Sequence, residues 1–351
     1  MMPALEPVGP RLGRDRGAVA VFAPSLILTV AIEQGAGGPE LHIHAGGQGL
    51  WVARMAASLG AKALLCSALG GESGAVLAGL LARSGIELVS SRSAGANGAY
   101  VHDRRGGERR PVVEIAGRPL TRHELDDLYG KALIAALDCG TLVLAGSQDR
   151  LIDPDIYRRL AVDTRENGVA VVADLTGAPL AGALEGGLTL LKISEEELAR
   201  AGLQSGSLDA QLASVAELHR RGADNVILSR GRAGALALAD GQLMEVVGPQ
   251  LIAADYHGTG DSMTAAAAVG ISRGLSASDW LRLAAAAGAV NATRHGLGTG
   301  ARNEIEHLSG HVQIRSLRPA GPRAASAAPS SRHGAADAAR GPAGRSERIC
   351  T

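Results

Sequence analysis

The sequence predicts a three-layer α/β domain, with a mostly parallel central sheet between helices and a small β-sheet lid. Short apolar runs alternate with longer helical patterns through residues 18–312, and this alternation is typical of a parallel sheet that helices cover on both faces. Residues 97–116 instead alternate polar and apolar side chains around a glycine-rich turn, which indicates an antiparallel hairpin. A chain of 351 residues, 46% of them hydrophobic, can bury the core that such a domain requires.

The order of the elements follows from the apolar periodicity and from the glycines that end several helical patterns. Strands of the central sheet are expected at residues 19–22, 64–68, 142–145, 169–173, 188–191, 226–228 and 236–238. Helices are expected at residues 50–59, 75–83, 122–137, 155–166, 208–221, 262–272 and 279–293. The lid is expected to combine residues 28–45 with the hairpin at residues 97–116.

Both ends of the sequence differ in composition from the predicted domain. Residues 1–17 mix Pro, Gly, Glu and Arg without a continuous apolar stretch, so a flexible N-terminus is expected. Residues 313–351 consist largely of Pro, Ala, Ser, Gly and Arg. Because such a segment buries too little apolar surface to offset the entropy of ordering, the sequence predicts a disordered tail.

The charge and cysteine content exclude several classes of partner. Thirty-five basic residues balance thirty-five acidic ones, so no net field favours nucleic acid or an anionic membrane. No stretch has the roughly eighteen uninterrupted apolar residues of a membrane span. Cys66, Cys139 and Cys350 lie far apart and are odd in number, which suits a reducing cytoplasm. We therefore expect a cytoplasmic protein that binds small molecules.

The segment most indicative of chemistry is residues 255–261, Asp-Tyr-His-Gly-Thr-Gly-Asp, which leads directly into an alanine-rich helix. Unpaired N–H groups and the helix dipole make such a start an anion site. Asp261 stands where a carboxylate would accept a proton from a substrate hydroxyl. The structural alternative is that Asp261 is an ordinary first-turn acid and that the glycines form a tight turn.

A second glycine-rich turn, Gly46-Gly47-Gln48-Gly49, also precedes a predicted helix. It lacks the third glycine of a dinucleotide-binding fingerprint, because Val52 stands there, and the sequence has no P-loop. The turn nonetheless indicates close approach of the backbone to another group. Asp174, Lys192 and Ser229 follow or end predicted strands, where open α/β sheets bind ligands.

Together these segments resemble the PfkB or ribokinase-like family of carbohydrate kinases, closest to its 1-phosphofructokinase and tagatose-6-phosphate kinase branch. Residues 46–54, Gly-Gly-Gln-Gly-Leu-Trp-Val-Ala-Arg, are similar to the first family signature, and residues 255–261 are similar to the second, Asp-Thr-x-Gly-Ala-Gly-Asp. The resemblance extends from about residue 18 to about residue 308. It implies a ribokinase-like α/β/α sandwich that uses ATP and Mg²⁺.

The resemblance also implies a role for each matching residue. Asp261 resembles the catalytic base, and Gly258, Thr259 and Gly260 resemble the anion hole. The matching acceptor-binding positions are Gly46, Gly47, Gln48 and Asp255. The matching nucleotide-binding positions are Lys192, Ser229, Gly231, Gly234 and Asn291, and Glu197 matches a residue that organises Mg²⁺ through water.

Several residues depart from the pattern of the branch. Ile27 stands where a carboxylate is expected, Gln48 replaces a lysine, Gly98 replaces an arginine and Ser194 replaces an asparagine. The first choice of function remains ATP-dependent phosphorylation of a hexose or hexose phosphate, in a protein that dimerises through its lid as relatives often do. The departures keep two alternatives open: a kinase for another hydroxyl compound such as a nucleoside, and a catalytically weak regulatory protein that binds a sugar or a nucleotide.

Overall fold

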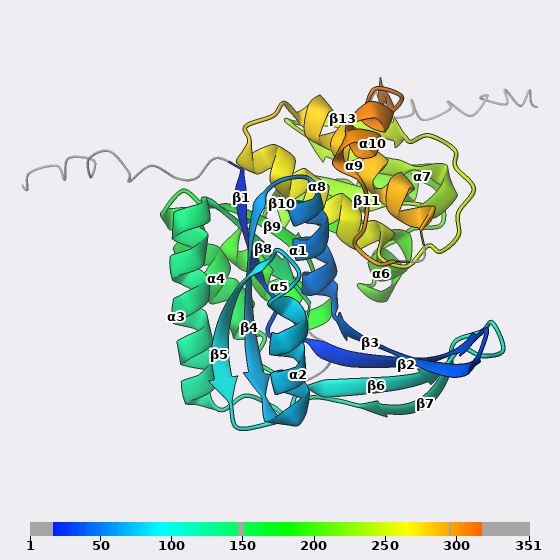
Figure 1. The fold of residues 1–351 in the computed structure, drawn as a ribbon. Helices are drawn as coiled ribbons and strands as arrows, with labels where there is room; N and C mark the ends of the chain where they lie inside the picture. The colour runs from blue at the N-terminus through cyan, green and yellow to red at the C-terminus, as the bar shows by residue number, and fades with distance from the viewer. Residues whose placement is uncertain (1–16, 147–150, 295, 318–351) are drawn as a thin grey trace, which may run out of the picture. The chain divides into compact units, whose positions relative to one another are not determined.

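The central sheet forms the middle layer of the protein (Figure 1). The structure is a computed structural model that describes residues 17–146, 151–294 and 296–317. Within these ranges the sheet has ten strands: β1 (Ala18–Phe22), β4 (Lys62–Gly70), β5 (Glu87–Ser93), β8 (Thr141–Ala145), β9 (Ala170–Asp174), β10 (Leu188–Ser194), β11 (Ala223–Ser229), β12 (Ala235–Ala239), β13 (Gln242–Val247) and β14 (Gln313–Ser316). Their spatial order is β14-β13-β12-β11-β10-β9-β8-β1-β4-β5.

The strands from β11 to β5 in that order are parallel, whereas β12, β13 and β14 extend the sheet in antiparallel fashion. In β1, Val19 and Val21 enter the core on one face and Ala18, Ala20 and Phe22 enter the core on the other. This separation follows from the two-residue period of a strand. Because both faces are buried, the parallel strands read as continuous apolar runs, which is why the sequence predicts them well.

Helices cover both faces of the sheet, which confirms the predicted three-layer α/β/α architecture. One face is covered by α1 (Gln48–Ser58), α2 (Gly71–Leu81), α8 (Thr259–Ser272), α9 (Ala277–Ala292) and α10 (Arg302–Ser309). The other is covered by α3 (Arg122–Cys139), α4 (Asp155–Glu166), α5 (Gly177–Gly186), α6 (Glu195–Arg200) and α7 (Leu208–Arg220). No helix in the described part of the chain combines the length and apolarity that a membrane span needs.

Helix α8 is buried along most of its length. Every residue from 261 to 270 is buried, and the side chains of Ala265, Ala266, Ala267 and Ala268 have no exposed surface. The helix packs against α1, α9 and the strands at the centre of the sheet. Small side chains permit this close packing: an added Cβ at Gly270 would lie 2.4 Å from the Cβ of Trp280.

A second, smaller sheet projects beside the central one (Figure 1). Among the described residues it contains four strands in the order β3-β2-β6-β7: β2 (Ile27–Gly35), β3 (Gly38–Gly46), β6 (Gly98–Asp103) and β7 (Arg110–Ile115). Strands β2 and β6 are parallel, and the two outer pairings are antiparallel. These strands occupy the two predicted lid segments, and the prediction of a separate small β-sheet is confirmed.

The C-terminal boundary of the domain differs from the prediction. Residues 313–316 were expected to begin a disordered tail, but they form β14 and pair with β13 from Val247 to Met244. The expected boundary at residue 312 is therefore too early. The strand is not predicted from the sequence because its residues are mostly polar and exposed and form no apolar pattern. Its strand conformation depends on pairing with β13. The flexible segment expected at residues 1–17 lies outside the described residues except for Gly17, as does the predicted tail beyond Leu317.

Candidate active site

The beginning of α8 brings together the glycines and the acid of residues 258–261. Gly258 adopts a left-handed conformation with φ of 72°, and its carbonyl accepts a hydrogen bond from the Ser262 hydroxyl at 2.8 Å. Among the described residues, no side chain caps the first turn, and the buried hydroxyl of Thr259 has no hydrogen-bond partner. Unpaired donors at a helix start are suited to an anion such as a phosphate group.

Asp261 is buried in the first turn of this helix. Burial, reinforced by the nearby Asp174 carboxylate, raises its pKa to about 7, although Lys192 and a hydrogen bond from Gln48 act in the opposite direction. A carboxyl group with such a pKa exchanges its proton near neutral pH. That is the property required of a general base that takes a proton from a hydroxyl.

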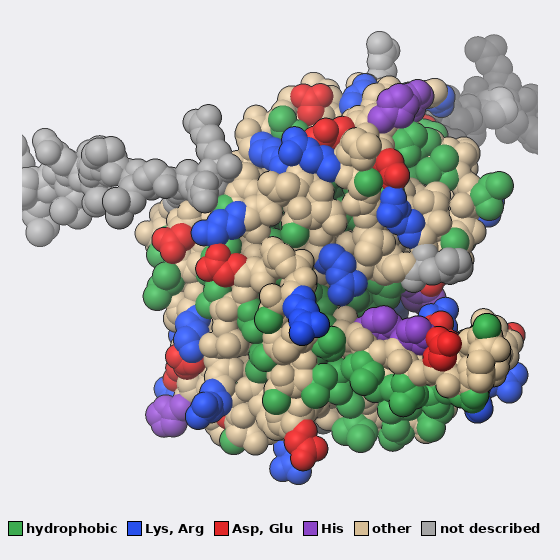
Figure 2. Space-filling view, viewed as in Figure 1, with side chains coloured by type: hydrophobic (Ala, Val, Ile, Leu, Met, Phe, Trp, Pro, Cys, Tyr) green, Lys and Arg blue, Asp and Glu red, His purple; other side chains and the backbone are tan. Residues whose placement is uncertain are grey.

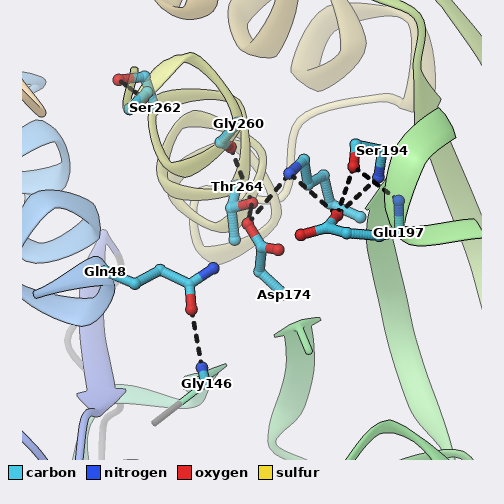
Figure 3. A network of polar contacts seen from close by, with 10 residues as sticks. Gln48, Gly146, Asp174, Ser194, Glu197, Gly260, Ser262 and Thr264 are labelled. Atoms are coloured by element: carbon cyan, nitrogen blue, oxygen red, sulfur yellow. Dashed lines mark hydrogen bonds and ion pairs between the residues drawn. The ribbon is translucent and has the colours of Figure 1, made fainter. Parts of the chain in front are cut away.

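A buried charge cluster lies beside Asp261 (Figure 3). The Lys192 ammonium lies 3.3 Å from an oxygen of Asp174 and 3.9 Å from an oxygen of Glu197. The Thr264 hydroxyl, from the next turn of α8, donates to Asp174 at 2.9 Å. Burial opposes the charge of Lys192, but attraction to Asp174 and Glu197 outweighs it and raises the lysine pKa. The site therefore contains a lysine that stays cationic next to the Thr259–Gly260 turn.

Glu197 is fixed at the start of α6 by a capping box. Its carboxylate accepts from the Ser194 backbone N–H at 2.8 Å, and its own N–H donates to the Ser194 hydroxyl at 3.2 Å. Burial opposes ionisation, but Lys192 and this backbone hydrogen bond lower the pKa of Glu197. Within the described ranges, no group of three His, Cys, Asp or Glu side chains could hold a metal directly. The acidic oxygens present fit a Mg²⁺ ion that keeps mostly water and phosphate ligands.

A cavity of about 510 Å³ opens beside the Thr259–Gly260 turn. Predicted residues Lys192, Ser229, Gly231 and Gly234 all line it, together with small side chains of α9. Gly234 has φ of 81°, and an added Cβ would lie 2.3 Å from the Val246 carbonyl oxygen, so the loop requires glycine there. A cavity of this volume, lined by small apolar side chains and by the start of a helix, is suited to a nucleotide.

Asn291 was predicted to line the nucleotide pocket, and it is not among the residues that line this cavity. Its amide donates to the His257 carbonyl at 2.8 Å and accepts from the Gly298 N–H at 2.9 Å. Its neighbours Ala289 and Ala292 reach the cavity instead. The Asn291 side chain therefore holds the turn before α8 through its hydrogen bond to the His257 carbonyl.

The second glycine-rich turn joins β3 to α1. Gly47 has φ of 122°, and the amide oxygen of Gln48 accepts from the Gly146 N–H at 2.9 Å. An added Cβ at Gly49 would lie 2.3 Å from the Cβ of Ala23, so this glycine lets α1 approach β1. The turn thus meets the carboxyl ends of β1 and β8, and Gln48 connects it to Asp261.

Asp255, predicted to bind the acceptor, shapes its own loop in the structure. Its carboxylate accepts from the His257 backbone N–H at 2.9 Å and contacts the His257 ring at 2.6 Å. Burial opposes the charge, but these contacts lower the pKa of Asp255. The carboxylate is thereby held on the rim of the turn that ends at Gly258.

Residues 25–304 match the sequence pattern of the pfkB family of carbohydrate kinases. The chain belongs to this family. This kinase is 26% identical over 302 residues to 1-phosphofructokinase of Vibrio cholerae, covering 84% of the chain and 95% of the relative. It is 29% identical over 316 residues to ATP-dependent 6-phosphofructokinase isozyme 2 of Mycobacterium tuberculosis, covering 86% and 91%. The expected family and its carbohydrate kinase class are confirmed.

The fold of the kinase is also that of known relatives. The solved structure of Arabidopsis thaliana ribokinase complexed with ribose and ATP superimposes with a TM-score of 0.66 at 22% identity, covering 83% of this chain and 98% of the other. This likeness confirms the ribokinase-like fold, including the small sheet beside the large one.

The sequence gives little indication of two residues in the candidate site, Asp174 and Thr264. Asp174 ends a predicted strand, a feature too common to single it out, and Thr264 lies within a helix-forming run. Their hydrogen bond joins residues 90 positions apart. The spacing of three residues between Asp261 and Thr264 places both on one face of α8, and it is a signal for Thr264 alone.

Proposed function

We propose that this kinase transfers the terminal phosphoryl group of ATP to a hydroxyl of a hexose phosphate or a hexose, with Asp261 as the general base. The single observation that carries the proposal is the buried carboxyl of Asp261, with a pKa of about 7, next to the Thr259–Gly260 turn that lines the nucleotide-sized cavity. The names of the phosphofructokinase relatives support the choice of acceptor.

In the proposed reaction the acceptor hydroxyl gives its proton to the Asp261 carboxylate while its oxygen forms a bond to the terminal phosphorus of ATP. The bond from that phosphorus to the bridging oxygen breaks, and ADP leaves. The N–H groups of Gly258, Thr259 and Gly260 stabilise the charge on the transferred group, and Lys192 adds a fixed positive charge. Mg²⁺ bound with the nucleotide would neutralise phosphate charge, with Glu197 holding it through water.

The test is ADP release by purified protein with ATP and Mg²⁺ across fructose 1-phosphate, fructose 6-phosphate, tagatose 6-phosphate, hexoses, pentoses and nucleosides. Turnover with one sugar class that disappears in Asp261→Asn would support the proposal. Asp279→Asn is the matched control, because Asp279 holds the corresponding first-turn position of α9 but is exposed. Equal turnover in wild type and Asp261→Asn would remove Asp261 from the chemistry.

A nucleoside acceptor is the second candidate, and Ile27 is the observation that favours it. This side chain is only 9% exposed at the start of β2 and offers no oxygen to a sugar hydroxyl. A preference for nucleosides over all sugars in the same panel would decide for this candidate. ATP or sugar binding without turnover would instead indicate a regulatory binding protein.

We also propose that the small sheet acts as a lid and mediates a homodimer. Val30 pairs with Ile43 and with Val101, which pairs with Val113, so these side chains share one face of the sheet. Ile43 is 47% and Val113 is 43% exposed, and Figure 2 shows hydrophobic side chains gathered along this sheet. Such an apolar face is suited to pairing with a second copy.

Sedimentation velocity tests the dimer. Val113→Lys should convert it to a monomer, whereas His44→Lys on the opposite face of the same sheet should leave it unchanged. A wild-type protein that sediments as a monomer, or a Val113→Lys variant that remains dimeric, would contradict this interface. The expected cytoplasmic location is part of the same proposal, and the buried Cys66, which forms no disulfide, suits a reducing compartment.

A further inference from the structure

The side chain of Gln48 connects the glycine-rich turn before α1 to the end of β8. Gln48 is the first residue of α1, and its amide oxygen accepts a hydrogen bond from the Gly146 backbone N–H at 2.9 Å. An added Cβ at Gly146 would lie 3.1 Å from that oxygen. A larger residue at this position would therefore make the Gln48 amide shift by a few tenths of an ångström.

This contact fixes the orientation of the amide. Since an N–H group needs an acceptor, the oxygen of Gln48 must face Gly146 and the NH₂ group must face away from it. A side-chain hydrogen bond also joins Gln48 to Asp261, and it lowers the pKa of that carboxyl. An amide NH₂ donates to a carboxylate but cannot accept from a protonated carboxyl, so the contact favours the ionised acid.

The other groups around Asp261 do not provide this interaction. Asp174 repels the negative charge of Asp261. Lys192 attracts it but lies 3.3 Å from Asp174 and 3.9 Å from Glu197, so its charge is shared. Figure 3 shows Gln48 lying between Gly146 and the Asp174–Thr264 pair. Gln48 thus interacts with Asp261 as a neutral donor.

We propose that Gln48 is a positioning residue, which holds the Asp261 carboxylate with its amide NH₂ while the Gly146 N–H holds its amide oxygen. The proposal rests on the proposed function in treating Asp261 as the base. It assigns Gln48 to the base, in place of the acceptor contact expected from the sequence.

The chemistry of the position explains why glutamine stands there. A lysine would donate to Asp261, but it could not accept from the Gly146 N–H. A glutamate would accept from Gly146, but it would place a second carboxylate against Asp261. Glutamine satisfies both neighbours without adding charge.

A double-mutant cycle on melting temperature at pH 8 tests the contact without any assay of activity. Gln48→Glu in the wild-type background should lower the melting temperature by about 3 °C, because two carboxylates then face each other. In the Asp261→Asn background the same change should lower it by less than about 1 °C, because the new amide of residue 261 donates to the new carboxylate. Equal losses in both backgrounds would overturn the proposal.

Two further variants complete the cycle. Gln34→Glu makes the same change on an exposed lid residue and should have the same small effect in both backgrounds. Should Gln48→Glu fail to fold, Gln48→Met removes the donor without adding charge and supports the same cycle. Because Gly146 loses its acceptor in both backgrounds, a loss that is larger in wild type than in Asp261→Asn is the expected result.

The second readout is the pH dependence of turnover. Gln48→Glu and Gln48→Met should lower kcat at pH 7 by at least about tenfold and move the rise of kcat/KM to higher pH, with the KM for ATP within about twofold. An unchanged pH profile with a raised acceptor KM would overturn the proposal and return Gln48 to acceptor binding. If wild-type protein shows no turnover, the proposed function fails, but the melting cycle still decides the role of Gln48.

Discussion

Replacing Asp261 by asparagine should stabilise the protein more at pH 8 than at pH 5. The carboxyl is buried, and its pKa rises from 3.8 in the ordinary case to about 7 in the folded protein. The folded protein therefore binds more protons than the unfolded chain between about pH 4 and pH 7, so stability falls as the pH rises through this window. Asparagine has nearly the same shape and removes this penalty.

The magnitude follows from the size of the shift. At about 1.36 kcal/mol for each pKa unit, the raised pKa of Asp261 lowers the free energy of unfolding by on the order of 4 kcal/mol at pH 8 but only about 1.6 kcal/mol at pH 5. The advantage of Asp261→Asn should therefore grow by about 3 kcal/mol between the two pH values. With an unfolding entropy of roughly 0.6 kcal/mol/K for about 300 ordered residues, that difference corresponds to about 4–5 °C in melting temperature.

Differential scanning calorimetry of wild type and Asp261→Asn at pH 5, 6, 7 and 8 measures this quantity. Groups that titrate alike in both proteins cancel in the difference between their melting temperatures. Asp279→Asn, at the corresponding but exposed position of α9, is the matched control at the same four pH values. A difference for Asp261→Asn that stays constant within about 1 °C from pH 5 to pH 8 would refute the reasoning.

Three further predictions concern the nucleotide loop, the charge cluster and the tail. Gly234→Ala should abolish measurable ATP binding in calorimetric titration and destabilise the fold by about 1–3 kcal/mol, because its Cβ would strike the β13 backbone; Gly231→Ala should cost less, because it adds only the strain of a positive φ of 55° and meets no neighbouring atom. Lys192→Met should destabilise the protein by about 3–5 kcal/mol in urea unfolding, because it leaves buried carboxylates without their cation, and a change below about 1 kcal/mol would contradict the ion pair. Removing residues 318–351, which contain few large apolar side chains, should leave the melting temperature unchanged, and a drop of several degrees would show that the tail docks.

The parallel core of the fold is readable from sequence because each strand carries its own signal. All five residues of β8 are apolar or small and buried, and the glycine after α3 ends that helix in a left-handed conformation. By contrast, β5 and β14 are polar strands at the two edges of the sheet. Their strand conformation depends on pairing with a neighbour, which a local pattern does not encode.

The residues of the candidate site also differ in how well the sequence predicts them. Asp261 and the turn before it form a contiguous motif, so the sequence predicts their role directly. The contacts of Asp174 with Lys192 and with Thr264 arise where β9, β10 and α8 meet. Asn291 lies within the expected segment, but the direction of its side chain depends on how α9 packs. Such long-range geometry is set by tertiary packing.

The run of fully buried alanines in α8 limits how this enzyme can change. A larger side chain anywhere from Ala265 to Ala268 would have to displace the sheet, α1 or α9. Any such displacement would move the turn that carries Asp261, the proposed base. Variation that alters which acceptor is used should therefore accumulate in the small sheet and in the loops around the cavity, and libraries for directed evolution should leave α8 untouched.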